Sequence, residues 1–133
     1  MNREIKFRGK NYENKWKYGD LVQEKWGQGK AIMIKKDTTA WSVLEDTVGQ
    51  YTGLDDKNGK KIYEGDIVKF RFKTDREEYP DLIGYIEYQT TFTAFRIMSN
   101  KGSFKIDVLD LKFIEVIGNI TDNPELLGGE DER

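Results

Sequence analysis

Apolar and charged residues alternate with a period of two along much of this chain, and this alternation restricts its fold more than any other feature. Residues 67–73 show it most clearly, because their apolar side chains fall on one side and their cations on the other. A period of two is typical of a half-buried strand, whereas an amphipathic helix needs a period near 3.6. The pattern therefore predicts a mainly β protein.

The strand candidates are short and are separated by glycine, asparagine and aspartate. They are residues 5–8, 16–18, 21–25, 31–35, 41–44, 47–52, 67–73, 84–88, 92–98, 104–108 and 116–120. Many short strands at roughly ten-residue spacing are typical of barrels and sandwiches. We expect small SH3-like barrels: residues 1–55 as a basic, aromatic-rich β unit, residues 56–127 as a barrel packed on it, and residues 128–133 as a polar tail.

Glycine-containing segments predict the turns. Residues 27–30 predict the tip of a hairpin, and Asn58-Gly59 predicts another, because both residue types tolerate positive φ. Gly65-Asp66 predicts a corner into a following strand. Gly19-Asp20 precedes a similar Leu-Val pair 46 residues earlier and predicts the same kind of turn, which leaves an internal duplication open.

One short helical turn is expected near the C-terminal end. Asn123 suits the N-cap, Pro124 the first helical position, and Glu125 the first turn, where the helix dipole favours a carboxylate. Residues 107–113 carry a weaker helical signal.

Composition excludes several classes of chemistry. The chain has no cysteine and no histidine, so it has no thiol nucleophile, no zinc–thiolate site and no Ser-His-Asp relay. We expect no cofactor and no metal. No apolar run is long enough for a signal peptide or a membrane span, so we expect a cytoplasmic protein without membrane contact.

Charge is unevenly distributed along the chain. Residues 1–36 carry a net charge of +6, and residues 37–56 carry −5. Basic residues interleaved with aromatic ones suit single-stranded nucleic acid, and the candidate contacts are Lys15, Lys17, Lys25, Lys69, Arg71 and Lys73. The sequence pI near 5.3 favours the alternative, in which the aromatics form the core and the lysines are solvated.

Four carboxylates, Asp55, Asp56, Glu64 and Asp66, are the candidates for acid/base or metal chemistry. The calcium-loop pattern does not fit, because placing Gly59 at its sixth position puts Leu54 where the first carboxylate belongs. Because no nucleophile–base set accompanies the carboxylates, we expect no catalytic residues.

Three segments, residues 5–8, 50–68 and 118–127, resemble the YopX family in order and spacing. The resemblance implies a mostly β fold with SH3-like barrel character and a phage or prophage origin, and it implies no known activity. The residues of the signature to which we give a structural role are Gly53, Asn58, Gly59, Gly65, Asp66, Gly118, Asn123 and Pro124. A functional interpretation, in which Tyr51, Thr52, Tyr63 and Glu64 line a ligand groove, stays open.

The sequence thus favours a non-enzymatic β-rich protein-interaction module, which binds another protein or a second copy of itself. Single-stranded nucleic-acid binding through the basic N-terminal segment is the alternative, and a carboxylate-dependent hydrolase is the third hypothesis.

Overall fold

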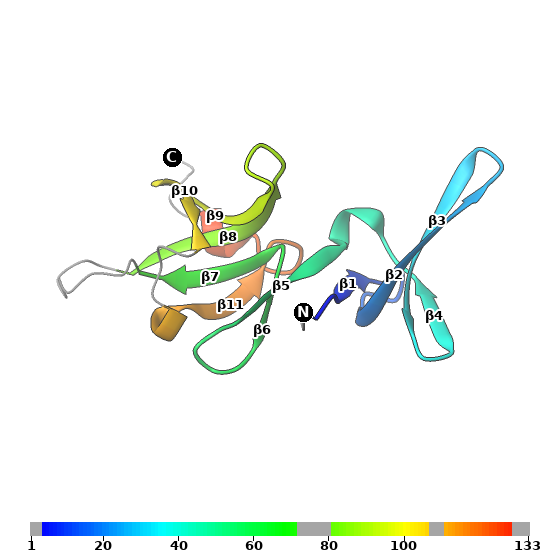
Figure 1. Cartoon of the computed structure of the whole chain (residues 1–133), viewed down its shortest axis with the longest axis horizontal. Helices are drawn as coiled ribbons and strands as arrows, with labels where there is room; N and C mark the ends of the chain where they lie inside the picture. The colour runs from blue at the N-terminus through cyan, green and yellow to red at the C-terminus, as the bar shows by residue number, and fades with distance from the viewer. Residues whose placement is uncertain (1–3, 72–80, 107–110, 129–133) are drawn as a thin grey trace. The chain divides into compact units, whose positions relative to one another are not determined.

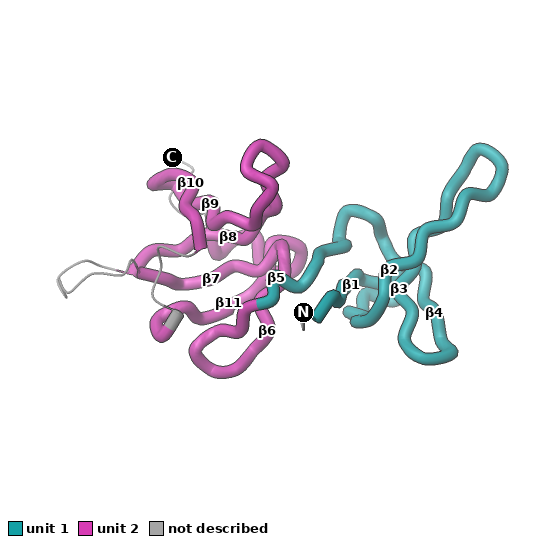
Figure 2. The backbone as a smooth tube through the Cα atoms, viewed as in Figure 1, with its two compact units in different colours: residues 1–53 teal, residues 54–133 magenta. Residues whose placement is uncertain are grey.

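The computed structural model describes residues 4–71, 81–106 and 111–128, and it divides the chain into two compact units. The first unit comprises residues 1–53 and the second residues 54–133 (Figure 2). Lys73, residues 107–110 of the weaker helical signal and most of the polar tail lie outside the described residues. The expected packing of the second unit on the first stays a prediction.

The first unit is an antiparallel sheet with the strand order β4-β3-β2-β1-β5 (Figure 1). A 3₁₀ turn, η1 (Glu45–Thr47), precedes β5. The strands are β1 (Phe7–Lys10), β2 (Trp16–Trp26), β3 (Gly29–Lys36), β4 (Thr39–Ser42) and β5 (Gly49–Asp55). The last residues of β5 belong to the second unit, where β6 (Lys61–Tyr63) follows it in the strand order.

The second unit is built on a five-stranded antiparallel sheet with the order β10-β9-β8-β7-β11. Its strands are β7 (Asp66–Phe70), β8 (Leu82–Gln89), β9 (Ala94–Ser99), β10 (Gly102–Lys105) and β11 (Glu115–Asn119). A 3₁₀ turn, η3 (Leu111–Phe113), precedes β11, and a single helical turn, α1 (Glu125–Gly128), follows it. The mainly β prediction is confirmed. β10 and β11 stand at opposite ends of the strand order, so closed SH3-like barrels remain a prediction.

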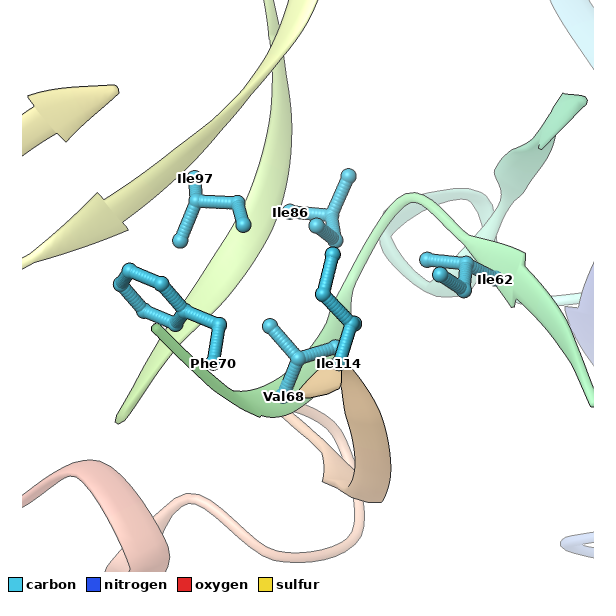
Figure 3. Close-up of a cluster of buried hydrophobic side chains, with 6 residues drawn as sticks. All are labelled: Ile62, Val68, Phe70, Ile86, Ile97 and Ile114. Atoms are coloured by element: carbon cyan, nitrogen blue, oxygen red, sulfur yellow. The ribbon is translucent and has the colours of Figure 1, made fainter. Parts of the chain in front are cut away.

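The core of the second unit lies on one face of this sheet. Six buried side chains form it: Ile62, Val68, Phe70, Ile86, Ile97 and Ile114 (Figure 3). The alternation in β7 explains the arrangement, because Val68 and Phe70 point to the core while Lys69 between them does not. Burying each such side chain contributes about 1.5–3 kcal/mol.

The two Gly-Asp pairs take different structures, which corrects one prediction. Gly65-Asp66 forms the expected corner: Gly65 has a φ of 93°, and the Oδ2 of the buried Asp66 accepts the Tyr63 N–H at 2.7 Å. Gly19-Asp20 makes no turn, because β2 runs through it without interruption. Gly19 is required there for space, since a Cβ would collide with the backbone carbonyl of Lys35 on β3. The similarity in sequence between the two Gly-Asp pairs is therefore not accompanied by a similarity in local structure.

The Asn123 side chain bonds to the strand before it rather than to the helical turn after it, which differs from the prediction. Asn123 was expected to cap the helix, yet its Oδ1 accepts the N–H of Asn119 at the end of β11, at 3.2 Å. Gly118 makes room for this contact, because a Cβ at that position would lie 2.6 Å from the Asn123 Oδ1. The helical turn itself, predicted for residues 123–127, is confirmed at Glu125–Gly128.

Candidate interaction surface

A two-stranded ribbon extends from the sheet of the first unit. β2 pairs with β1 only through residues 16–19, and β3 pairs with β4 only from Met33 onward, so the intervening part of the β2–β3 hairpin has no third strand beside it. Figure 1 shows it projecting beyond β1 and β4. Gly27 and Gln28 form the predicted tip, and the φ of 63° at Gly27 suits a type II′ turn. We call residues 23–30, all of them exposed, the ribbon tip.

The register gives the ribbon tip two different faces. On one face lie Glu24 and Trp26, whose indole N–H donates to the Glu24 carboxylate at 3.2 Å. Trp26 has 67% of its surface exposed. On the other face Lys25 stands directly opposite Lys30, and Lys30 forms an ion pair with Glu45 at 3.0 Å. A large aromatic side chain is thus exposed on one face, and on the other face Lys25 lies opposite a lysine that Glu45 already pairs.

Sequence reasoning did not single out Trp26 as a site residue. It appeared only as one of several aromatics among the lysines of the N-terminal segment. The signal was present, because Trp26 directly precedes a Gly-Gln-Gly turn and therefore had to lie at the end of a hairpin. That no third strand covers this end depends on the lengths of β1 and β4, which alternation alone does not define.

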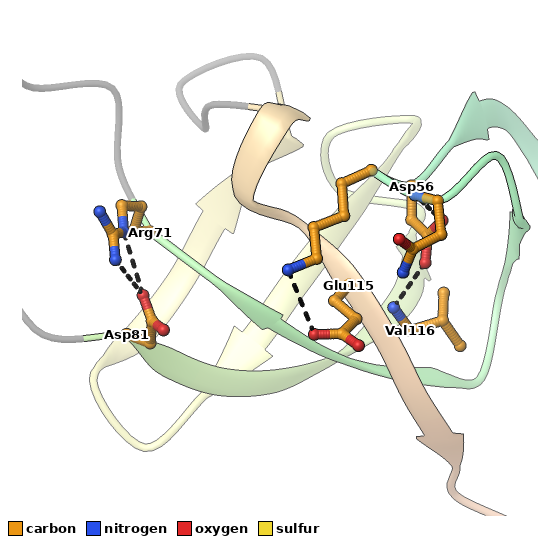
Figure 4. Close-up of polar contacts among 7 residues, drawn as sticks. Asp56, Arg71, Asp81, Glu115 and Val116 are labelled. Carbon is orange, nitrogen blue, oxygen red and sulfur yellow. Dashed lines mark hydrogen bonds and ion pairs between the residues drawn. The ribbon is translucent and has the colours of Figure 1, made fainter.

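The six basic candidates for nucleic-acid contact are divided between the units. Lys15, Lys17 and Lys25 belong to the first unit, and Lys69 and Arg71 belong to the second. Lys17 lies over the Trp41 ring at 4.6 Å, and Lys25 is at the ribbon tip. Arg71 is held by the Asp81 carboxylate at 3.0 Å (Figure 4). Its guanidinium also lies over the Phe113 ring. Arg71 is therefore already neutralised, and a common basic surface formed by both units stays a prediction.

The four groove candidates are also divided. Tyr51 and Thr52 belong to the first unit, and Tyr63 and Glu64 to the second. Both tyrosines are buried, and Glu64 accepts the backbone N–H of Tyr88 at 3.3 Å. The ligand groove stays a prediction.

Asp56, the clearest of the carboxylate candidates, binds backbone rather than a ligand. Its Oδ1 accepts the N–H groups of Asn58 and Lys60 at 2.8 and 2.9 Å, and its Oδ2 accepts that of Val116 at 2.9 Å (Figure 4). Burial by itself would raise the pKa of Asp56, but the three N–H donors and the Lys60 charge outweigh it and lower this pKa below the ordinary value. The carboxylate therefore stays charged and ties the turn at Asn58-Gly59 to β11, 60 residues away.

The other acidic residues do not assemble into a centre in the part of the chain that the structure describes. Asp66 is used at its own corner, and no group of three or more acidic side chains there is arranged to hold a metal ion. The remaining signature glycines take backbone conformations that suit turns, with φ of 90° at Gly53 and 81° at Gly59. Pro124 directly precedes α1, as expected for the start of a helix.

Within the described ranges, no helix has both the length and the apolar character that crossing a bilayer requires.

Comparison with known proteins identifies the family. A model of the YopX protein family matches residues 6–128. The chain belongs to the YopX family. No curated protein matches it. Among solved structures, this YopX chain is similar to protein EF1440 from Enterococcus faecalis, at 26% identity and a TM-score of 0.54. That likeness covers 95% of this chain and 99% of the other, so it extends over both units.

Proposed function

We propose that this YopX-family chain is a non-enzymatic protein-interaction module that binds its partner through the ribbon tip, with Trp26 as the anchor. The exposure of Trp26 on an uncovered hairpin is the observation that carries the proposal. Tryptophan is enriched among residues that dominate binding energy, because a buried indole contributes a large apolar area at a low entropic cost. The partner chemistry that fits is a protein surface with an apolar pocket for the ring and an acidic rim facing Lys25.

Three further elements complete the proposal, of which the first and the third come from the family resemblance. They are a phage or prophage origin, action in the bacterial cytoplasm, and SH3-like barrel character for the second unit, open between β10 and β11. The engagement of Asp56 and Asp66 with backbone N–H groups supports the absence of catalysis, since neither carboxylate is poised to transfer a proton.

The test is a comparison of two exposed aromatics in the first unit. Tagged wild type, Trp26→Ala and Tyr12→Ala proteins are used for quantitative affinity capture from cells that express the natural partner set. Tyr12 is 72% exposed and lies in the turn between β1 and β2, so it is the matched control. A partner lost with Trp26→Ala and kept with Tyr12→Ala is then purified, and titration calorimetry should show at least about a tenfold loss of affinity.

Equal capture by both variants would contradict the proposal. Self-association is separated by light scattering on the purified chain. A dimer that Trp26→Ala dissociates would identify the partner as a second copy.

Nucleic-acid binding by Lys15, Lys17 and Lys25 is the alternative, and one observation favours it. Lys17 and Lys25 occupy positions of the same parity in β2 and therefore face the same side of the sheet. Under this alternative, binding of a generic oligonucleotide weakens steeply with salt, and Lys25→Gln weakens it further.

A further inference from the structure

A pocket in the second unit combines an exposed ring with two cations, and the proposed function does not involve it. Its volume is about 460 Å³, and it is lined by Phe92, Ala94, Phe95, Arg96, Lys105 and Ile106. It lies where β10 ends beside the first residues of β9. A second hollow, of about 310 Å³, is lined by residues 87–92. Phe92 lines both hollows.

The ring of Phe92 has Arg96 over one face and is otherwise largely exposed. Its side chain is 52% exposed, and the Arg96 guanidinium lies 4.1 Å from its centroid. Phe95 also lines the pocket and makes an edge-to-face contact with Tyr88, with their centroids 5.2 Å apart. The wall of the pocket is therefore aromatic, and one of its rings is left largely in solvent.

Arg96 is held in place before any ligand arrives. Its Nε donates to the Ser103 hydroxyl at 2.8 Å, and its Nη2 donates to the Ser103 carbonyl at 3.0 Å. The Ser103 hydroxyl in turn donates to Gln89 at 3.2 Å. A guanidinium has five N–H donors, so three remain for an anion. Because the side chain is already ordered, binding an anion costs little further entropy.

A second cation, Lys105, lies on the same face of the sheet as Arg96. Lys105 stands directly opposite Arg96 in the β9–β10 pair. Like charges in this position repel each other. Glu87 flanks Arg96 on β8 and accepts a hydrogen bond from the Tyr85 hydroxyl at 3.2 Å. Within the described ranges no carboxylate pairs with Lys105, and an anion between the two cations would relieve their repulsion.

We propose that this pocket binds a nucleotide unit, with the base stacked on Phe92 and the phosphate held by Arg96 and Lys105. A planar base uses the exposed ring, and a phosphate matches the fork of the guanidinium. An acidic peptide would satisfy the cations and leave the ring in water. A free mononucleotide and one residue of a single strand present the same chemistry, so both sources are tested.

The experiment uses the full chain at low salt. Its probes are uridine monophosphate, inorganic phosphate, fluorescein-labelled oligo(dT) of eight nucleotides and a glutamate-rich peptide. Binding is followed by amide chemical shifts for the unlabelled probes and by fluorescence polarisation for the oligonucleotide. The variants are Phe92→Ala and Lys105→Gln, both at exposed positions. The matched control is Phe113→Ala, because Phe113 also lies under an arginine, Arg71, whose charge Asp81 neutralises.

We expect Phe92→Ala to weaken nucleotide binding by about fivefold or more, which is the range for loss of one stacked base. Lys105→Gln should weaken binding and reduce its salt dependence, while Phe113→Ala changes affinity less than about twofold. Comparable affinity for the mononucleotide and the oligonucleotide assigns the site to free nucleotides. Tighter binding of the oligonucleotide assigns it to single strands.

Four results would overturn the proposal. They are no saturable binding of either nucleotide probe, equal affinity for phosphate and mononucleotide, tighter binding of the acidic peptide, and oligonucleotide binding that Lys25→Gln abolishes and Phe92→Ala leaves unchanged. Far-UV circular dichroism of each variant confirms that it is folded.

Discussion

The two units use similar strands in different ways. The second unit gathers six buried side chains into one cluster and uses two aspartates, Asp56 and Asp66, to satisfy backbone N–H groups. The first unit places much of its longest hairpin in solvent, and its Gly19-Asp20 pair stays within a strand. The difference shows that the alternation of apolar and charged residues predicts where strands form. It does not predict which neighbouring segments bury them. The second unit therefore contains the buried cluster of six side chains, and the first contains the exposed ribbon tip.

The largest expected effect tests where stability resides. Phe70→Ala removes the largest fully buried side chain of the second unit and should lower the free energy of unfolding by about 3–5 kcal/mol. Urea unfolding followed by circular dichroism measures the loss. All three tryptophans lie in the first unit, so their fluorescence reports on that unit alone. We expect the fluorescence transition to shift less, and an equal shift would show that the units unfold together.

The next prediction compares the two Gly-Asp pairs directly. Asp66→Ala leaves the N–H of Tyr63 without its acceptor in a buried position and should cost about 1.5–3 kcal/mol. Asp20→Ala, at an exposed position, should change stability by less than about 0.5 kcal/mol. Urea midpoints of the two variants are the measurement. Similar losses of stability in the two variants would show that the two Gly-Asp pairs are structurally equivalent and would contradict the prediction.

The contribution of Asp56 to the stability of the second unit should depend on pH. Its pKa is lower in the folded chain than in the unfolded one, so its contribution is complete above about pH 4 and is lost as pH falls through the folded pKa. Asp56→Asn replaces one acceptor oxygen by a donor and should cost about 1–3 kcal/mol at pH 7.

The measurement for Asp56 is the free energy of unfolding of both proteins between pH 6 and pH 3. The difference between wild type and Asp56→Asn should shrink only below about pH 4. A constant difference across this range would mean that charge is not what holds the turn.

We expect the smallest loss of stability at Gly118 on β11. Gly118→Ala places a Cβ against Asn123 and Leu126, and because both contacts are side-chain ends that shift, we expect a loss of about 1 kcal/mol. Gly29→Ala at the ribbon tip is the control, since its Cβ meets no atom closer than 3.7 Å. Thermal midpoints separate the two. A larger loss at Gly29 would show that the ribbon tip is more tightly packed than its exposure indicates.

Local features of the chain were sufficient to predict the mainly β class, the hairpin at residues 27–30, the turn at Asn58-Gly59 and the family. Each of these rests on local alternation, turn chemistry or a linear motif. Two hydrogen bonds could be found only from the tertiary structure: the one from the Asn119 N–H to Asn123 and the one from the Val116 N–H to Asp56. Both depend on neighbours that folding makes adjacent. The same holds for Arg96 and Lys105, which lie opposite each other because β9 and β10 pair. Short-range physics fixes a strand or a turn, whereas exposure and proximity depend on which segments pack together.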